Sequence, residues 1–202
     1  TATGESGSFV IESHGATGET FFYEIVLTVT DSAGITDTKS ITVIPELPTA
    51  TLPAPWLGQE VGNIGLAGMA DYTNSTFTIK GSGIDIGDFN DGFYYVYQKL
   101  SGDGEIKARV VNVQNTAFGS KAGVMIRAAL TGNAAHTFVS ISPTEGVAQE
   151  RRDETGFGTA LVSAGYFAPP RWVRIVRSGN TITGYHSPDG VLWARVSTAT
   201  IN

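Results

Sequence analysis

Apolar and polar residues alternate with a period of two along most of the chain, and turn-forming residues interrupt the alternation at short intervals. This pattern is typical of β-strands that bury one face. No stretch shows the 3.6-residue period of an amphipathic helix, and no apolar run approaches the roughly 18 residues of a membrane-spanning helix. The sequence therefore predicts an all-β chain.

The N-terminal part predicts one clear hairpin. Residues 21–29 (FFYEIVLTV) form the first strand, the turn follows at Asp31 to Gly34, and residues 36–43 form the return strand. Residues 9–11 could add a short third strand. Three strands are too few for an independent sandwich.

The C-terminal part predicts ten strands joined by tight turns such as Gly102-Asp103-Gly104. We expect these strands to build an antiparallel β-sandwich. The expected strands are 65–72, 76–81, 93–100, 105–113, 122–129, 137–142, 147–152, 172–177, 181–186 and 192–196.

The distribution of charge divides the chain near residue 55. Residues 1–55 hold seven acidic residues and one lysine, whereas residues 56–202 hold twelve acidic and twelve basic residues. Four prolines lie between positions 45 and 55, and prolines at that density favour an extended connector. We expect a partial first module over 1–45, a Pro-rich linker over 46–55 and a β-sandwich over 56–202.

The stretch LTVTDSAGITDTKSITVIP, residues 27–45, resembles the last two strands of bacterial PKD-like (Ig-like) modules. It covers the back half of such a module.

Three ordered blocks in the C-terminal part resemble concanavalin-like, laminin-G-like β-sandwich modules: residues 81–110, 121–130 and 171–196. Modules of this family accompany secreted bacterial carbohydrate-active proteins, often beside PKD-like modules. The resemblance implies a concanavalin-like jelly roll, secretion and a fused catalytic domain in a multidomain bacterial parent protein.

The residues give little support for catalysis. The acidic residues Glu145, Glu150, Asp153 and Glu154 lack the Glu-x-Asp-x-x-Glu spacing of the concanavalin-like glucanases. The three histidines are far apart in sequence, and no cysteine is present. We expect no enzymatic activity, and we expect these acidic residues to be solvated or ion-paired.

One loop could hold a structural calcium ion. Asp85, Asp88 and Asp91 fall within seven residues, and calcium prefers carboxylate and carbonyl oxygens. The alternative is an ordinary turn before the strand at Phe93. The segment from Ser187 to Trp193 resembles, with one residue fewer, an Asp-box hairpin of sialidases, which implies that Asp189 closes the turn and that Trp193 packs beneath it.

Carbohydrate recognition requires aromatic rings and planar hydrogen-bonding groups on one face. Strand alternation supplies six candidates, of which Arg127 and Arg151 are expected to form a donor array suited to acidic glycans. The candidate ligand-binding residues are Arg109, Arg127, Gln149, Arg151, Trp172 and Tyr185. The alternative is that the tryptophans belong to the core and the arginines cover an exposed sheet.

The predicted function is that of a non-catalytic carbohydrate-binding module that docks polysaccharide on a sheet face. The alternative is a structural or adhesive spacer that associates through open sheet edges. The net charge of −6 argues against generic nucleic-acid binding, and no membrane partner is expected.

Overall fold

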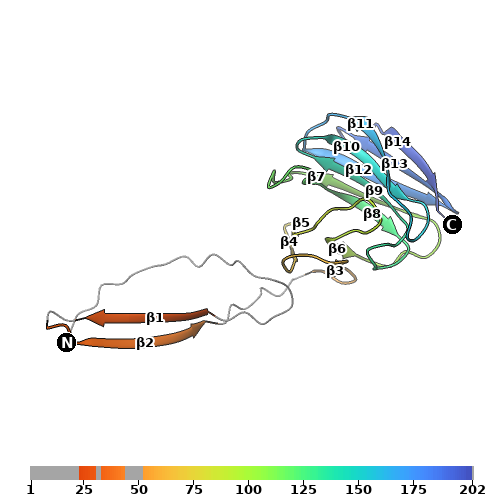
Figure 1. Ribbon diagram of the computed structural model, residues 1–202. Coiled ribbons are helices and arrows are strands. Elements are labelled where there is room, and N and C mark those ends of the chain that lie inside the picture. The colour runs from red at the N-terminus through yellow and green to blue at the C-terminus, as the bar shows by residue number, and fades with distance from the viewer. Residues whose placement is uncertain (1–22, 31–32, 44–51, 202) are drawn as a thin grey trace. The chain divides into compact units, whose positions relative to one another are not determined.

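The computed structural model describes residues 23–30, 33–43 and 52–201 of the 202-residue chain (Figure 1). The chain divides into two compact units, Thr1–Thr49 and Ala50–Asn202, and the division falls inside the Pro-rich segment 46–55. Every regular element in the described residues is a β-strand, and every strand pair is antiparallel. The expectation of an all-β chain is therefore confirmed.

The first unit contains the hairpin that the alternation predicted. Strand β1 (Tyr23–Thr30) pairs with β2 (Thr36–Val43), with Tyr23 opposite Val43 and Thr30 opposite Thr36. Gly34 lies in the turn with a φ of 82°, a conformation that favours glycine. The short strand expected over residues 9–11 lies outside the described residues.

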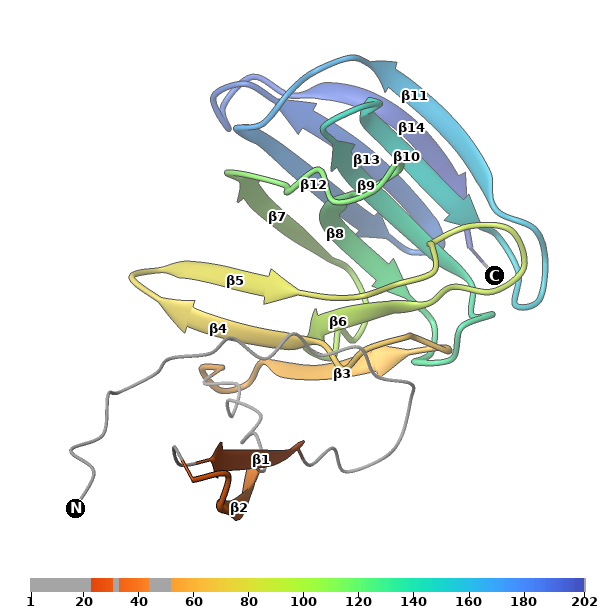
Figure 2. The ribbon, with the colours of Figure 1, turned by 60° about the vertical axis from the view of Figure 1, so that its left-hand side comes forward.

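The second unit is built around two four-stranded sheets (Figures 1 and 2). The first, called here the groove sheet, has the order β11-β10-β9-β8. The second, called the ladder sheet, has the order β14-β13-β12-β7. The groove sheet comprises β8 (Ala122–Arg127), β9 (His136–Ser142), β10 (Gly146–Arg152) and β11 (Ala160–Gly165). The ladder sheet comprises β7 (Gly104–Val110), β12 (Arg171–Ser178), β13 (Thr181–Ser187) and β14 (Ala194–Thr200).

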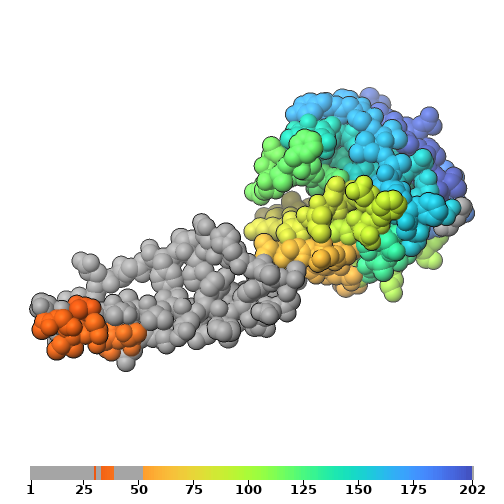
Figure 3. Space-filling view, in the orientation of Figure 1, coloured from red at the N-terminus to blue at the C-terminus, as the bar shows by residue number. Residues whose placement is uncertain are grey.

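Two short strand pairs complete the second unit. Strand β3 (Leu57–Val61) pairs with β6 (Phe93–Tyr97), and β4 (Met69–Thr73) pairs with β5 (Thr76–Lys80). In the space-filling view, the segment that carries these four strands forms one side of the unit, in orange to yellow-green (Figure 3). Phe93 and Tyr95 of β6 pack against Met125 and Phe138 on the groove sheet.

The two large sheets share one apolar core. Alternate residues of each sheet point to the other sheet, as the period-two pattern requires. The fully or nearly fully buried members of this core are Val124, Val139, Ile141, Val147, Val173, Ile175 and Ile182. Each large sheet therefore has an inner face in this core and an outer face that points away from it.

The ten expected C-terminal strands are all present, with ends that differ by a few residues. Two strands were missed. Strand β3 is short and contains a glycine, and β11 (ALVSAG) has no alternation of apolar and polar residues. Both are recognised only through their partners, β6 and β10.

Candidate functional site

A row of small side chains crosses the outer face of the groove sheet. The antiparallel register places Gly123, Ser140, Ala148 and Ser163 side by side, one from each strand. Larger side chains stand beside this row, among them Glu150 opposite Leu161. The result is a groove of about 140 Å³, and its lining residues are Lys121, Ser140, Ser142, Glu145, Gly146, Ala148, Glu150, Leu161 and Ser163.

Lys121 forms ion pairs with two carboxylates, Glu150 and Asp85, at one side of the groove. The Lys121 ammonium donates to both carboxylate oxygens of Glu150 at 3.0 and 3.2 Å, and to the Ile86 carbonyl at 3.2 Å. Its Nζ also lies 2.8 Å from Oδ1 of Asp85. The Glu150 side chain is 3% exposed, the Lys121 side chain 15% and the Asp85 side chain 60%, so the network runs from the sheet toward solvent.

The pKa values of this network follow from burial and pairing. Burial opposes the positive charge of Lys121, but the hydrogen bonds to Asp85 and Glu150 outweigh that effect and raise the Lys121 pKa. Burial raises the pKa of Glu150, and Lys121 acts in the opposite direction. Since Lys121 engages both oxygens of Glu150, this carboxyl is an ion-pair partner and not a free proton donor.

Two exposed phenylalanines stand on loops next to the groove. Phe89 is 63% exposed and Phe157 is 60% exposed. The loop of Phe89 begins at Asp85, which pairs with Lys121, and the loop of Phe157 leads into β11 and its groove residue Leu161. The two loops are adjacent, because the Thr159 amide donates to the Asp88 carbonyl at 2.8 Å.

Arg152 fixes both loops from inside the protein. Its side chain is fully buried and lies on the outer face of β10, on the same side as Glu150. The guanidinium donates to the carbonyls of Gly87 and Asp88 at 3.2 Å each and to the Phe157 carbonyl at 2.8 Å. The backbone beneath both phenylalanines is therefore held by one side chain.

Asp91 balances the charge of this buried region. Its Oδ1 lies 2.8 Å from Nη2 of Arg152, and its Oδ2 lies 3.2 Å from Nη1 of Arg127. His136 contacts the same carboxylate, with 3.5 Å between Nδ1 and Oδ2. Burial lowers the pKa of His136 to about 4, although Asp91 acts in the opposite direction. His136 is therefore a neutral, buried histidine at pH 7.

Three of the six predicted ligand-binding residues lie on the groove sheet but do not form an array. Arg127 and Arg152 both lie opposite His136, so they share the outer face, whereas Arg151 lies opposite Thr137 and points to the inner face. The expectation that Arg127 and Arg151 share a face is wrong. Gln149 also points inward, is 1% exposed, and has no hydrogen-bond partner for its amide within the described part of the chain.

The other three predicted ligand-binding residues do share one face, the outer face of the ladder sheet. Trp172 lies directly opposite Arg109, and Tyr185 lies opposite Arg174, the next outward residue after Trp172. Arg174 is close to two rings, with its Cζ 5.7 Å from the Tyr185 centroid and 5.5 Å from that of Trp193. Their role as ligand-binding residues stays a prediction.

The aspartates predicted to bind calcium have different surroundings. Asp91 is held by two arginines, Asp85 is held by Lys121, and Asp88 is exposed with a φ of 44°. Among the described residues, no group of three or more acidic or histidine side chains is arranged to hold a metal ion. Calcium binding stays a prediction of the sequence.

The turn at Asp189 has the structural role that its resemblance implied. Asp189 accepts hydrogen bonds from the amides of Val191 and Leu192 at 2.8 and 2.9 Å, and from the Ser187 hydroxyl at 2.8 Å. These bonds lower its pKa. The expected ring is wrong, however: Trp172 lies beneath Gly190, whereas the Trp193 ring lies 5.5 Å from the Arg174 Cζ.

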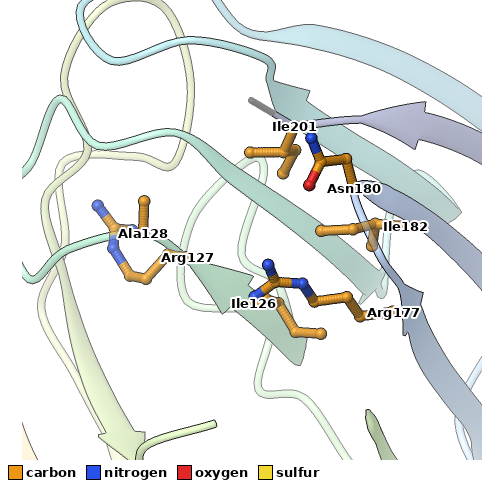
Figure 4. Close-up of a pocket in the computed structure, with 7 residues that line it drawn as sticks. All are labelled: Ile126, Arg127, Ala128, Arg177, Asn180, Ile182 and Ile201. Atoms are coloured by element: carbon orange, nitrogen blue, oxygen red, sulfur yellow. The ribbon is translucent and has the colours of Figure 1, made fainter. Parts of the chain in front are cut away.

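A second cavity, of about 150 Å³, lies where the core opens between the two large sheets. Its walls are mainly the isoleucines Ile126, Ile182 and Ile201, and the Arg127 side chain points away from them (Figure 4). Arg177 and Asn180 lie at its rim (Figure 4), and the cavity is small, so we assign it to the end of the core.

The described residues contain no helix of the length and hydropathy that would cross a membrane. No family model, no curated protein and no solved structure matches the chain.

The groove could not be predicted from the sequence, because its residues belong to no common motif. The ion-paired residues of the groove, Lys121, Glu150 and Asp85, are far apart along the chain and meet only in the folded protein. The sequence held one hint of the groove, the serines of β9 and β11. A small residue on the outer face of a strand leaves room for a groove, but the sequence does not show which serines lie side by side.

Proposed function

We propose that residues 50–202 form a non-catalytic carbohydrate-binding module that holds a polysaccharide segment in the groove of the β8–β11 sheet. The observation that carries this proposal is the pairing of a polar groove with two exposed phenylalanines on loops that Arg152 fixes. Sugar rings bind by stacking their C–H faces on aromatic rings while their hydroxyls exchange hydrogen bonds with polar side chains.

The chemistry of the groove suits neutral hydroxyl groups. Lys121 and Glu150 pair with each other, and Glu145 adds a carboxylate to the lining, so the groove accepts hydrogen bonds from sugar hydroxyls and disfavours anions. The Ser163 and Ser142 hydroxyls, whose oxygens accept backbone amide hydrogen bonds, can donate to a sugar oxygen. Because Glu150, Asp85 and the Ile86 carbonyl hold the Lys121 ammonium in place, little of its side-chain entropy is lost on binding.

Two further parts of the proposal rest on resemblance. We propose that the two large sheets form a concanavalin-like β-sandwich, which is consistent with their shared core. We also propose that the parent protein is secreted, and that the module keeps a fused catalytic domain near its polysaccharide by raising the effective concentration.

The test is affinity electrophoresis of the full chain in gels that contain a panel of neutral polysaccharides. We expect retention by at least one glycan, and we expect Phe89→Ser and Phe157→Ser each to weaken it by about tenfold, the loss of one stacking contact. Leu192→Ser is the matched control, because it also removes an exposed apolar side chain, 74% exposed, but on the β13–β14 turn. Retention that is absent for every glycan, or equal in all variants, would contradict the proposal.

A second candidate function is association through a sheet edge. Strand β11 is an edge strand in the described sheets, carries no charge, and exposes Leu161 at 61% and Val162 at 38%. An uncharged, apolar edge is suited to pairing with another strand. Light scattering after gel filtration tests it: a concentration-dependent dimer that Val162→Lys abolishes would support association, and a monomer at all concentrations would exclude it.

A further inference from the structure

The outer face of the ladder sheet carries a row of three basic side chains and one tyrosine, with one register shift next to Tyr185. The register sets Lys107 of β7 opposite Arg174 of β12, Arg174 opposite Tyr185 of β13, and Tyr185 opposite Arg195 of β14. Strands lie about 4.8 Å apart, so the row spans roughly 14 Å at right angles to the strands. Arg109 lies in the neighbouring row, opposite Trp172.

This arrangement costs stability, because like charges placed directly opposite each other on a sheet repel. One acid reduces the cost. Glu105 accepts hydrogen bonds from Nε and Nη2 of Arg174, the first at 3.0 Å, and lies 3.5 Å from Nζ of Lys107. Two other carboxylates stand near the ends of the face, and both are engaged in turns: Asp103 with the Gly179 amide and Asp189 with the turn after Ser187.

Basic residues outnumber acidic residues on this face. Residues 56–202 are neutral overall, yet this face holds four of their twelve basic residues and one outward-pointing strand acid, Glu105. Arg109 and Arg195 are both exposed. The Tyr185 and Trp193 rings already lie against Arg174, so the face offers charge and donors more than open aromatic surfaces.

We infer that this face docks a linear polysaccharide that carries carboxylate groups, laid across the four strands along the Lys107–Arg195 row. A guanidinium binds a carboxylate through two parallel hydrogen bonds, which fixes both position and direction. An extended anionic chain can meet Lys107, Arg109 and Arg195 at once, whereas a single small anion can meet only one or two of them. This face lies on the opposite sheet from the groove and does not depend on the proposed function.

The test measures retention of the full chain by polygalacturonate, with its methyl ester as the uncharged form of the same polymer. We expect binding to polygalacturonate at low salt, and loss of that binding on raising the salt or on esterification. Arg109→Gln combined with Arg195→Gln should weaken it by about tenfold. Lys80→Gln combined with Lys99→Gln is the matched control, because both lysines are exposed, lie off this face and remove the same charge.

Three outcomes would overturn the inference. If both double variants lose the same amount of polygalacturonate binding, the polymer is attracted by basic residues in general and not by this face. Equal retention by the methyl ester would mean that the carboxylates are not recognised. Tighter binding to single-stranded DNA than to polygalacturonate would assign the face to a nucleic acid. The Phe89→Ser variant should bind polygalacturonate like the wild type, which separates this face from the groove.

Discussion

At the residue scale, Arg152 links the core to the candidate site. Its guanidinium pairs with Asp91 and donates to backbone carbonyls of three separate loops. A buried charge is tolerated only when it is paired and fully hydrogen-bonded, and Arg152 meets both conditions. The same contacts set the backbone of Phe89 and Phe157, so stability and the shape of the site depend on one side chain.

Replacing Arg152 by methionine should lower the free energy of unfolding by about 3–5 kcal/mol, because Asp91 loses its closest cation and several buried carbonyls lose their donor. Urea denaturation measures the change. Arg195→Met is the control, since Arg195 is exposed, and should cost less than about 1 kcal/mol. A loss below 1 kcal/mol for Arg152→Met would mean that the buried pair contributes little.

Replacing Gln149, in contrast to Arg152, should raise the free energy of unfolding. Its amide lies between the sheets against Gly184 and Val139 without a hydrogen-bond partner in the described residues. We expect Gln149→Met, which has a similar volume, to raise the free energy of unfolding by about 1 kcal/mol or more. Gln98→Met, at an exposed position, should leave it nearly unchanged. A lower stability for Gln149→Met would show that the amide is satisfied in solution.

At the element scale, strand pairing determines which residues share a face. Alternation within a strand correctly predicts that Trp172 and Arg174 share a face, and the register adds Tyr185 to it. Alternation does not determine the register between two strands. The expectation that Arg127 and Arg151 share a face fails because the register sets Arg152, not Arg151, opposite His136, the residue that also lies opposite Arg127. Bulges add to this, with register shifts at Val147/Ala148 and Gly184/Tyr185. The sequence predicted most strands, but not the groove that their register creates.

The β13–β14 turn gives a prediction at this scale. Gly190 has a φ of 77°, and a Cβ there would lie 2.9 Å from the Trp172 ring. Gly190→Ala should therefore cost strain of about 1 kcal/mol and, in addition, about 1–3 kcal/mol from overpacking. Gly102→Ala is the matched control, because Gly102 has a φ of 74° and open space around it. Equal melting temperatures for the two variants would contradict the packing of Trp172 beneath the turn.

At the scale of the whole molecule, the buried histidine makes stability depend on pH. The pKa of His136 is lowered to about 4 from 6.5, so the unfolded chain binds more protons than the native chain between these values. Stability is then full above pH 6.5 and falls as the pH drops through that range. His186, whose pKa burial and Arg171 also lower, acts in the same direction, whereas Glu150, whose pKa is raised, acts in the opposite direction.

Between pH 7.5 and 5.5 we expect His136 to account for a loss of about 1 kcal/mol in the free energy of unfolding. Urea titrations of the wild type and of His136→Gln at the two pH values measure it. The variant should lose less stability than the wild type by about that amount. An identical pH dependence in both proteins would mean that His136 titrates normally in the native state.

The central claim is that polysaccharide is held in the groove of the β8–β11 sheet. The most direct measurement is a titration of the ¹⁵N-labelled full chain with an oligosaccharide from the neutral polysaccharide that retains it best, followed by amide chemical shifts. We predict that the largest shifts fall on Ser140, Ala148 and Ser163 and on the loops of Phe89 and Phe157. Shifts confined to Arg109, Trp172 and Tyr185, or no shifts at saturating ligand, would contradict the account.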